Sequence, residues 1–435
     1  MTGTQVKQFL DREHLAADAI DMDKEIDKFI ANMDSGLMQQ QDAMNMLPTY
    51  IEVGRPIQTD ETVIVIDAGG TNLRVATLTF NQAFQAQIEH FQNYRMPGTD
   101  GAISKDSFFD QLIAYLEPVL PYSHKIGFCF SYATEMFPDR DGRVINFSKE
   151  VELPEVEGEV LGSNMKAALR RRGLDDQVEI VILNDTVAAL LGGMRESQSQ
   201  ARQFETYLGF ILGTGTNTAY IEDLSRIEKL GEARPSGHMI VNMESGSYPY
   251  VDRSPVDEII DRGTNAPGSY LFEKVVSGRY QGLQMWHTLK IACEAALFSA
   301  AFVSRFSRVE SLESYQLDQF LFRPEGDNIL ASCCDNDQDR LNLYYLIDNL
   351  FERAARYATI NLTAVLKHLN AGLNPLYPVA ITVEGTTFYK AKMLRPKIVY
   401  LMENYTRRKH GIHYEFIQAE NSNLIGAAIA ILTNG

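Results

Sequence analysis

The sequence predicts an α/β protein in which mixed sheets are covered by helices. Short apolar runs typical of buried strands occur in both halves of the chain, and two of these runs lead into a glycine hairpin and a return strand. Long helical patterns lie among and after them, which favours a layered α/β class. With 435 residues, the chain has the length of two or three domains.

Each element follows from the local pattern of apolar and turn-forming residues. In the first half we expect a helix at 5–35, a connector around Pro48 and Pro56, strands at 62–67 and 73–80, a helix at 104–120, a strand at 125–130, a helix at 164–172 and a strand at 178–183. In the second half we expect a helix after Asp185, strands at 206–212 and 218–222, helices at 284–306 and 341–369, strands at 378–383 and 413–417, and a helix from about Asn421.

The two glycine hairpins resemble each other. Asp67–Asn72 reads DAGGTN and Leu212–Asn217 reads LGTGTN, and each segment joins two apolar strands. One interpretation is a duplicated fold in which both halves offer a hairpin to one ligand. The alternative is that any two glycine hairpins look alike, since glycine and asparagine are ordinary turn residues.

Composition excludes several classes of protein. The net charge of −17 argues against a general nucleic-acid binder, which needs a basic surface. The cysteines form no CxxC pair, so neither a zinc site nor a disulfide framework is expected. We find no apolar leader and no apolar run of about 18 residues, so we expect a cytoplasmic protein without a membrane partner.

The first hairpin carries groups suited to a phosphate ligand. Gly69 and Gly70 let the backbone approach such a ligand closely, and Thr71 adds a hydroxyl donor. Asp67 at the strand end can hold a hydrated Mg²⁺. In the second hairpin, Thr214 and the backbone around it can bind phosphate in the same way. A plain structural hairpin is the alternative in both cases.

Carboxylates elsewhere are candidates for binding and proton transfer. Asp185 follows a buried strand, where ligands gather in α/β sheets, and it can accept a proton from a hydroxyl group. The alternative is an ordinary helix N-cap. Glu244, Glu273 and Lys149 are further candidates, although most such residues are simply solvated at the surface.

Seven segments in order resemble the hexokinase and glucokinase family of the actin-like ATPase superfamily, over nearly the whole chain. They are MLPTYI (46–51), VIDAGGTNLRV (65–75), LNDTVAAL (183–190), LGTGTNTAY (212–220), NAPGSYLFEKVVSGRYQG (265–282), VEGTTFYK (383–390) and AENSNLIGAAIA (419–430). The resemblance implies a two-domain actin-like ATPase (ribonuclease H-like) fold with mixed sheets and a central cleft.

The resemblance also implies a role for each matched residue. Asp185 is implied as the general base and Lys149 as the group that offsets charge on the transferred phosphoryl group. The implied hexose-binding set is Ser131, Ser148, Lys149, Asn184, Asp185, Asn217, Glu244 and Glu273. The implied nucleotide-binding set is Asp67 (which holds Mg²⁺ through water), Gly69, Gly70, Thr71, Asn72, Gly213, Thr214, Gly215, Gly385 and Gly426, the last two leaving space for the nucleoside.

Three departures from the family pattern lie on the sugar side. The Ser-Phe-Pro segment reads Ser131-Tyr132-Ala133, Thr-Lys-Gly reads Ser148-Lys149-Glu150, and Glu-Trp-Gly reads Glu244-Ser245-Gly246. They predict looser hexose affinity or discrimination than the family pattern suggests, because a stiffening proline and a supporting indole are absent.

The resemblance therefore predicts an ATP-dependent hexokinase that uses Mg²⁺ and phosphorylates the 6-hydroxyl of a hexose, most plausibly glucose. The expected domains are 57–187 with 420–435, and 1–56 with 188–419. The alternatives are a hexose-binding regulator without turnover and a cytoskeletal relative of actin. The oligomeric state is left open.

Overall fold

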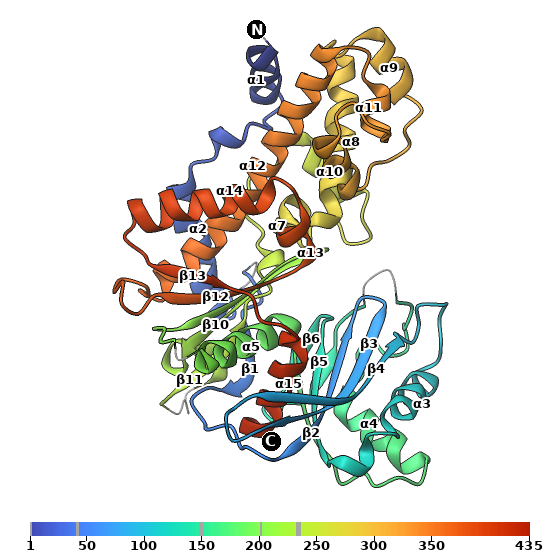
Figure 1. Cartoon of the computed structure of the whole chain (residues 1–435), viewed down its shortest axis with the longest axis vertical. Helices are drawn as coiled ribbons and strands as arrows, with labels where there is room; N and C mark the ends of the chain where they lie inside the picture. The colour runs from blue at the N-terminus through green and yellow to red at the C-terminus, as the bar shows by residue number, and fades with distance from the viewer. Residues whose placement is uncertain (1, 41–42, 148–150, 201, 232–235) are drawn as a thin grey trace.

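Two β-sheets organise the chain, whose computed structural model describes residues 2–40, 43–147, 151–200, 202–231 and 236–435 (Figure 1). A five-stranded sheet has the order β4-β3-β2-β5-β8, and a six-stranded sheet has the order β1-β11-β10-β9-β12-β13. A small two-stranded sheet pairs β6 with β7. The strands are β1 Leu47–Glu52, β2 Thr62–Gly69, β3 Asn72–Phe80, β4 Ala86–Arg95, β5 Lys125–Phe130, β6 Thr134–Met136, β7 Gly142–Val144, β8 Glu179–Leu183, β9 Tyr207–Leu212, β10 Thr216–Asp223, β11 His238–Asn242, β12 Val379–Glu384 and β13 Tyr414–Ile417.

The two large sheets share one topology. In the first, β2, β3 and β4 are antiparallel neighbours, and β2 continues into the parallel strands β5 and β8. In the second, β9, β10 and β11 are antiparallel and β9 continues into the parallel strands β12 and β13, with β1 added at one edge. The interpretation of a duplicated fold is thus confirmed, and each sheet carries one glycine hairpin.

The helices cover both sheets. The α-helices are α1 Thr2–Arg12, α2 Met22–Leu37, α3 Lys105–Leu116, α4 Leu161–Arg171, α5 Asp185–Ser199, α6 Pro255–Arg262, α7 Leu271–Val276, α8 Gly278–Glu294, α9 Ala300–Phe306, α10 Ser314–Phe322, α11 Ile329–Cys333, α12 Asp337–His368, α13 Thr386–Lys390, α14 Leu394–Leu401 and α15 Ser422–Asn434. Short helices are η1 Ala17–Ala19, η2 Leu120–Tyr122, η3 Leu224–Arg226, η4 Glu228–Leu230, η5 Ser245–Ser247 and the π-helix η6 Met402–Lys409.

Two segments that the sequence predicts as single helices each form two helices in the structure. The pattern at 5–35 divides into α1 and α2 because the side chain of Asp21 accepts a hydrogen bond from the backbone of Lys24 and starts a new helix. The pattern at 284–306 divides into α8 and α9 because Ser299 caps the second helix, accepting from the backbone of Phe302. The predicted connector around Pro48 contains β1, which pairs with β11.

α5 and α15 form a layer between the two sheets (Figure 1). α5 packs on β9 and β12, α15 packs on β2, β5 and β8, and the two helices pack against each other. The contact of α15 with β5 is close: a Cβ added at Gly127 would lie 2.1 Å from the Ala427 carbonyl oxygen. The packed pair of helices therefore connects the two sheets. The glycine hairpins extend from the same two sheets.

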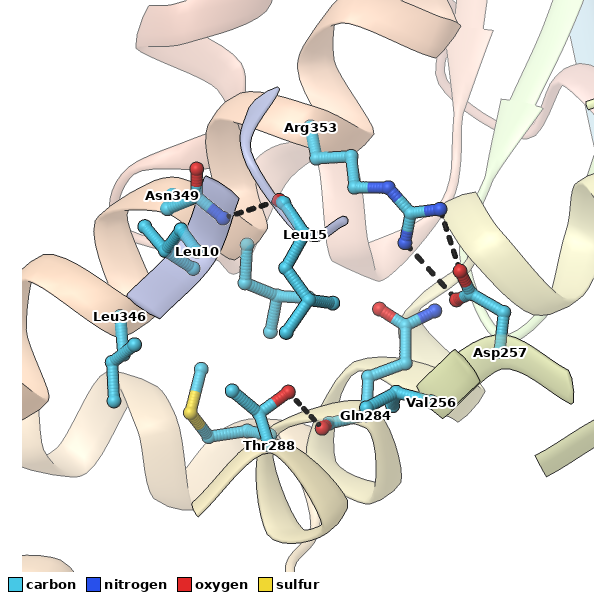
Figure 2. Close-up of a pocket in the computed structure, with 11 residues that line it drawn as sticks. Leu10, Leu15, Val256, Asp257, Gln284, Thr288, Leu346, Asn349 and Arg353 are labelled. Carbon is cyan, nitrogen blue, oxygen red and sulfur yellow. Dashed lines mark hydrogen bonds and ion pairs between the residues drawn. The ribbon is translucent and has the colours of Figure 1, made fainter. Parts of the chain in front are cut away.

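A helical region lies beyond the six-stranded sheet and contains a small cavity under α1 (Figure 2). Arg353 on α12 donates to both carboxylate oxygens of Asp257 on α6, over 3.0 and 2.6 Å. Asn349 on α12 donates to the Leu15 carbonyl over 2.9 Å. These contacts attach the N-terminal segment and α6 to the long helix α12. Among the described helices, none has both the length and the apolar character needed to cross a membrane.

Candidate active site

Asp67 is a buried residue near the end of β2, and two elements supply its partners. Arg74, opposite it on β3, donates to Oδ2 over 3.4 Å, and Asn423 at the start of α15 donates to Oδ1 over 3.1 Å. Burial raises the pKa of Asp67, while Arg74 and Asn423 oppose that rise. The predicted phosphate-side carboxylate is therefore held by the return strand of the hairpin and by helix α15.

The first hairpin turns at Gly70 and Thr71. Gly70 has a φ of +58°, in the left-handed region that favours glycine, and Thr71 is exposed at the turn, beside Asn72 at the start of β3. Gly69 allows a close approach: a Cβ there would lie 2.9 Å from the Ser131 hydroxyl oxygen. The turn is thus open at its tip and packed against the Ser131 loop at its base.

The second hairpin is built differently but also exposes a threonine. The Gly213 N–H donates to the Gly215 carbonyl over 2.9 Å, which leaves Thr214 exposed. The Gly213 carbonyl accepts from the backbone of Gly278 and from the Thr387 hydroxyl. Gly385 abuts this turn with a φ of +115°, and a Cβ there would lie 2.3 Å from the Leu212 carbonyl. The two predicted phosphate turns therefore both present hydroxyl groups.

Helix α5 is capped by Asn184 and not by Asp185, which was the alternative interpretation of Asp185 in the sequence. The Asn184 side chain accepts from the Thr186 backbone over 2.9 Å, and Asp185 is the first residue of α5. Because capping falls to Asn184, the carboxyl group of Asp185 stays available for a ligand. Burial raises the pKa of Asp185 to about 6; hydrogen bonds from Ser131 and Thr186 oppose the rise, and the nearby charge of Asp67 adds to it. A carboxyl group in this range is suited to proton transfer near neutral pH.

Glu244 and Glu273 belong to the same cluster as Asp185. Burial raises the pKa of Glu244, and the charge of Asp185 adds to the rise. Burial raises the pKa of Glu273 to about 7, with a contribution from Glu244. Glu273 accepts from the Thr216 backbone over 3.2 Å, in a position where a Cβ at Gly215 would lie 2.6 Å from Oε2. Three carboxyl groups from three elements thus interact around one space.

A chain of amides orients these carboxyl groups. Asn217 donates to the oxygen of Asn242 over 2.7 Å, and Asn242 donates to Glu244 Oε1 over 2.8 Å. Asn217 Nδ2 also lies 3.4 Å from the oxygen of Asn184. Hydrogen bonds therefore bring together three predicted residues, Asn184, Asn217 and Glu244. The residue that connects them, Asn242, was not predicted from the sequence. It ends the apolar run of β11, so a search for polar residues at strand ends would have found it.

The backbone supports the same arrangement. Glu244 adopts a left-handed conformation, with φ 53° and ψ 47°, which is unfavourable for a residue with a side chain and persists where surroundings enforce it. The Ser245 N–H donates to the Asn217 oxygen over 3.2 Å, and the buried Ser245 hydroxyl lies 3.3 Å from that of Thr218. Hydrogen bonds thus take the place of packing by the indole that the family pattern has here.

The remaining sequence-based predictions have separate outcomes. Ser131 begins the loop after β5 and hydrogen bonds to Asp185. Ser148 and Lys149, together with the departure at Glu150, lie outside the described residues. The nucleoside role of Gly426 stays a prediction; a Cβ there would lie 2.2 Å from the Ala188 carbonyl, so the glycine also allows the close approach of the α5 backbone. The lack of a side chain at Gly426 allows α15 and α5 to pack closely where they cross.

Comparison with known proteins identifies this arrangement. A family model described as hexokinase matches residues 207–433, and a second model with the same description matches residues 5–194. The chain belongs to the hexokinase family. Hexokinase-1 of Schizosaccharomyces pombe is 24% identical over 426 residues, which cover 93% of this chain and 85% of that protein. Human hexokinase-3 is 26% identical over 91% of this chain, which spans only 44% of the human protein.

Solved hexokinases have the same fold. A hexokinase from Schistosoma mansoni complexed with glucose superposes with a TM-score of 0.79 at 21% identity, covering 99% of this chain and 98% of that one. A second hexokinase structure gives a TM-score of 0.73 at 18% identity, covering 99% of each chain. The predictions of a two-domain sugar-kinase fold and of a hexose kinase are confirmed, and the hexokinase family generally uses ATP and Mg²⁺.

Proposed function

We propose that this hexokinase transfers the γ-phosphoryl group of ATP to the 6-hydroxyl of a hexose, with glucose as the expected substrate. The observation that carries the proposal is the position of Asp185. Its carboxyl group, with a pKa of about 6, lies within electrostatic reach of Asp67 on the first hairpin and of Glu244 beside the second. A proton acceptor therefore stands between a phosphate-type turn and a set of hydroxyl acceptors.

Each residue has a defined task in this mechanism. Glu244 and Glu273 accept hydrogen bonds from the hexose hydroxyls, and Asn184 orients the sugar beside them. Asp185 takes the proton from the reacting hydroxyl group as it attacks phosphorus. Thr71, Thr214 and the backbone of the two glycine turns hold the phosphate oxygens in line with that hydroxyl. We propose Lys149, from the matched motif, as a further group that offsets charge on the phosphoryl group.

The described residues fit the ATP and Mg²⁺ that the family uses. Mg²⁺ keeps several waters and binds through one or two carboxylates together with phosphate oxygens. Asp67 supplies one carboxylate, and no group of three or more potential ligand side chains gathers elsewhere in the described ranges. ATP·Mg²⁺ supplies the phosphoryl group and offsets its charge. We propose that Asp67 orients the hydrated ion.

We further propose that residues 57–187 with 420–435 form one domain and that 1–56 with 188–419 form the other. The packing of α15 on the first sheet and of α5 on the second supports this division. Binding of a hexose between the domains would exclude water from the phosphates, because water competes with the hexose as the attacking group.

A coupled assay with ATP·Mg²⁺ and a panel of glucose, mannose, fructose and glucosamine tests the proposal. We expect slow ATP consumption without sugar and faster consumption with at least one hexose. Equal consumption with and without every hexose would contradict it and favour the alternative, a hexose-binding regulator. A low glucose KM with sharp rejection of the other sugars would show that the replaced sugar-loop residues are compensated.

A further inference from the structure

Tyr132 connects the loop after β5 to the tip of the first hairpin. Its hydroxyl donates to the Gly70 carbonyl over 2.7 Å. Gly70 is the left-handed residue of the turn, so this bond restrains the part of the hairpin whose backbone would face phosphate. The bond joins residues 62 positions apart, which places a side chain of one loop on the backbone of another.

The ring of Tyr132 is held so that the hydroxyl has little freedom. Tyr132 is 5% exposed, and its ring centroid lies 4.9 Å from that of Phe130 and 5.0 Å from that of Phe147. The Tyr132 carbonyl accepts from the Thr134 hydroxyl over 2.9 Å, and the Ala133 carbonyl accepts from the Ile145 backbone over 2.8 Å. Aromatic packing and hydrogen bonds thus order this loop without the proline of the family pattern.

The same loop reaches the hexose side of the site. Ser131, next to Tyr132, hydrogen bonds to Asp185, and its backbone N–H donates to the Ala68 carbonyl over 2.9 Å. A cavity under the loop is lined by Tyr132 together with Asn184 and Asn242, two residues of the amide chain. One short segment therefore contacts the phosphate turn at one end and the proton acceptor at the other.

We propose that Tyr132 is a positioning residue that couples hexose binding to ATP binding through its hydroxyl. This inference rests on the proposed function for the identity of the two ligands. A hexose that contacts Ser131 and Asp185 further stabilises this loop, and with it the Tyr132 hydroxyl that holds the Gly70 turn in its phosphate-binding shape. Because coupling between two sites is reciprocal, bound ATP raises the affinity for hexose by the same factor.

The test is Tyr132→Phe, which removes the hydroxyl and keeps the ring. Tyr115→Phe is the matched control, since Tyr115 belongs to α3 and stacks on Tyr94 of β4 with ring centroids 4.1 Å apart. Calorimetry measures the Kd of a non-hydrolysable ATP analogue with Mg²⁺, with and without saturating glucose. The ratio of these two constants is the coupling factor.

We expect Tyr132→Phe to lower the coupling factor about three- to tenfold, the range of one lost hydrogen bond. In steady-state assays the KM for ATP should rise by a similar factor, while the thermal midpoint stays close to that of Tyr115→Phe. Gly69→Ala, which forces Ser131 away from the turn, should lower the coupling in the same way.

Two outcomes would overturn the inference. One is a coupling factor that is the same in Tyr132→Phe and in the unmodified protein, whether that factor is large or small. The other is an equal loss in Tyr115→Phe, which would indicate a general effect of removing a hydroxyl group. Turnover by the unmodified protein tests the proposed function separately, because the coupling factor is measured by binding alone.

Discussion

Asn242 holds the carboxylate of Glu244 through a hydrogen bond of 2.8 Å from Nδ2 to Oε1. The oxygen of the same amide accepts from Asn217 Nδ2, 2.7 Å away, which orients the amide so that its nitrogen faces Glu244. Two adjacent antiparallel strands, β10 and β11, thereby determine the orientation of the Glu244 carboxylate, the proposed hexose ligand. The residues that hold this carboxylate thus stand on rigid strands, which keep binding groups in place better than loops do.

Asn242→Asp tests this link, because it retains an acceptor for Asn217 and removes the donor to Glu244. We expect the hexose KM to rise about tenfold, with a smaller effect on kcat, since a buried acceptor loses its partner and faces a like charge. Steady-state kinetics with varied hexose measures the change. Asn374→Asp, at an exposed position before β12, controls for the added charge. An unchanged hexose KM would show that Glu244 needs no such support.

Asp185→Ala should lower kcat by about 10²–10⁴-fold, the usual loss for a general base. Hexose binding should weaken yet persist, because Glu244, Glu273 and Asn184 remain. Steady-state assays give kcat, and calorimetry gives the Kd of glucose. If the variant retains most of its kcat, Asp185 is not the base.

The pH profile should show an acidic limb near pH 6. Burial raises the pKa of Asp185 to about 6, and only the ionised carboxylate can accept a proton. We expect kcat/KM for the hexose to fall about tenfold per pH unit below that value. Residual activity of Asp185→Asn should lack this limb. A profile that is flat down to pH 4.5 would contradict the assignment.

Glu273→Gln should stabilise the protein without ligands above pH 7. Burial raises the pKa of Glu273 from 4.5 to about 7, so between these values the folded state binds more protons than the unfolded state. The stability contributed by this group therefore falls as pH rises through this window, and neutralising the group removes that loss. Thermal unfolding of both proteins at pH 8 and at pH 4 tests this prediction. The variant should exceed the unmodified protein at pH 8, and the difference should vanish at pH 4.

Gly426→Ala should destabilise the fold by about 1–3 kcal/mol, because the new methyl group meets the α5 backbone. Urea unfolding measures the loss. Gly3→Ala is the control, since a Cβ at Gly3 would meet no atom within 4 Å. At temperatures where the variant stays folded, its KM for ATP should match that of the unmodified protein. A raised KM for ATP with unchanged stability would instead support the predicted nucleoside role of Gly426.

The sequence is most informative where an apolar run ends in a polar or glycine residue. Gly70, Asp185 and Thr214 all stand at such places: Gly70 and Asp185 follow strands of the first sheet, and Thr214 follows a strand of the second. Segment matches then distinguish a kinase from a plain hairpin protein. Local pattern thus suffices for strands, hairpins and the residues directly after them.

Long-range partners are beyond local pattern. The Tyr132 hydroxyl bonds to a backbone carbonyl 62 residues earlier, and no spacing rule connects the two. The role of Gly426 depends on the α5 backbone, which lies more than 200 positions earlier in the chain. The single helix predicted at 5–35 failed for a different reason: the cap at Asp21 lies inside a continuous apolar periodicity that outweighed it.

The place of α15 has a consequence for biosynthesis. The strands it covers, β2, β5 and β8, leave the ribosome long before Ser422 is translated, so one apolar face of that sheet lacks this cover until α15 emerges. Exposed apolar surface of this kind attracts aggregation and chaperones. The first sheet can therefore complete its folding only after α15 has been translated, and not when its own strands emerge.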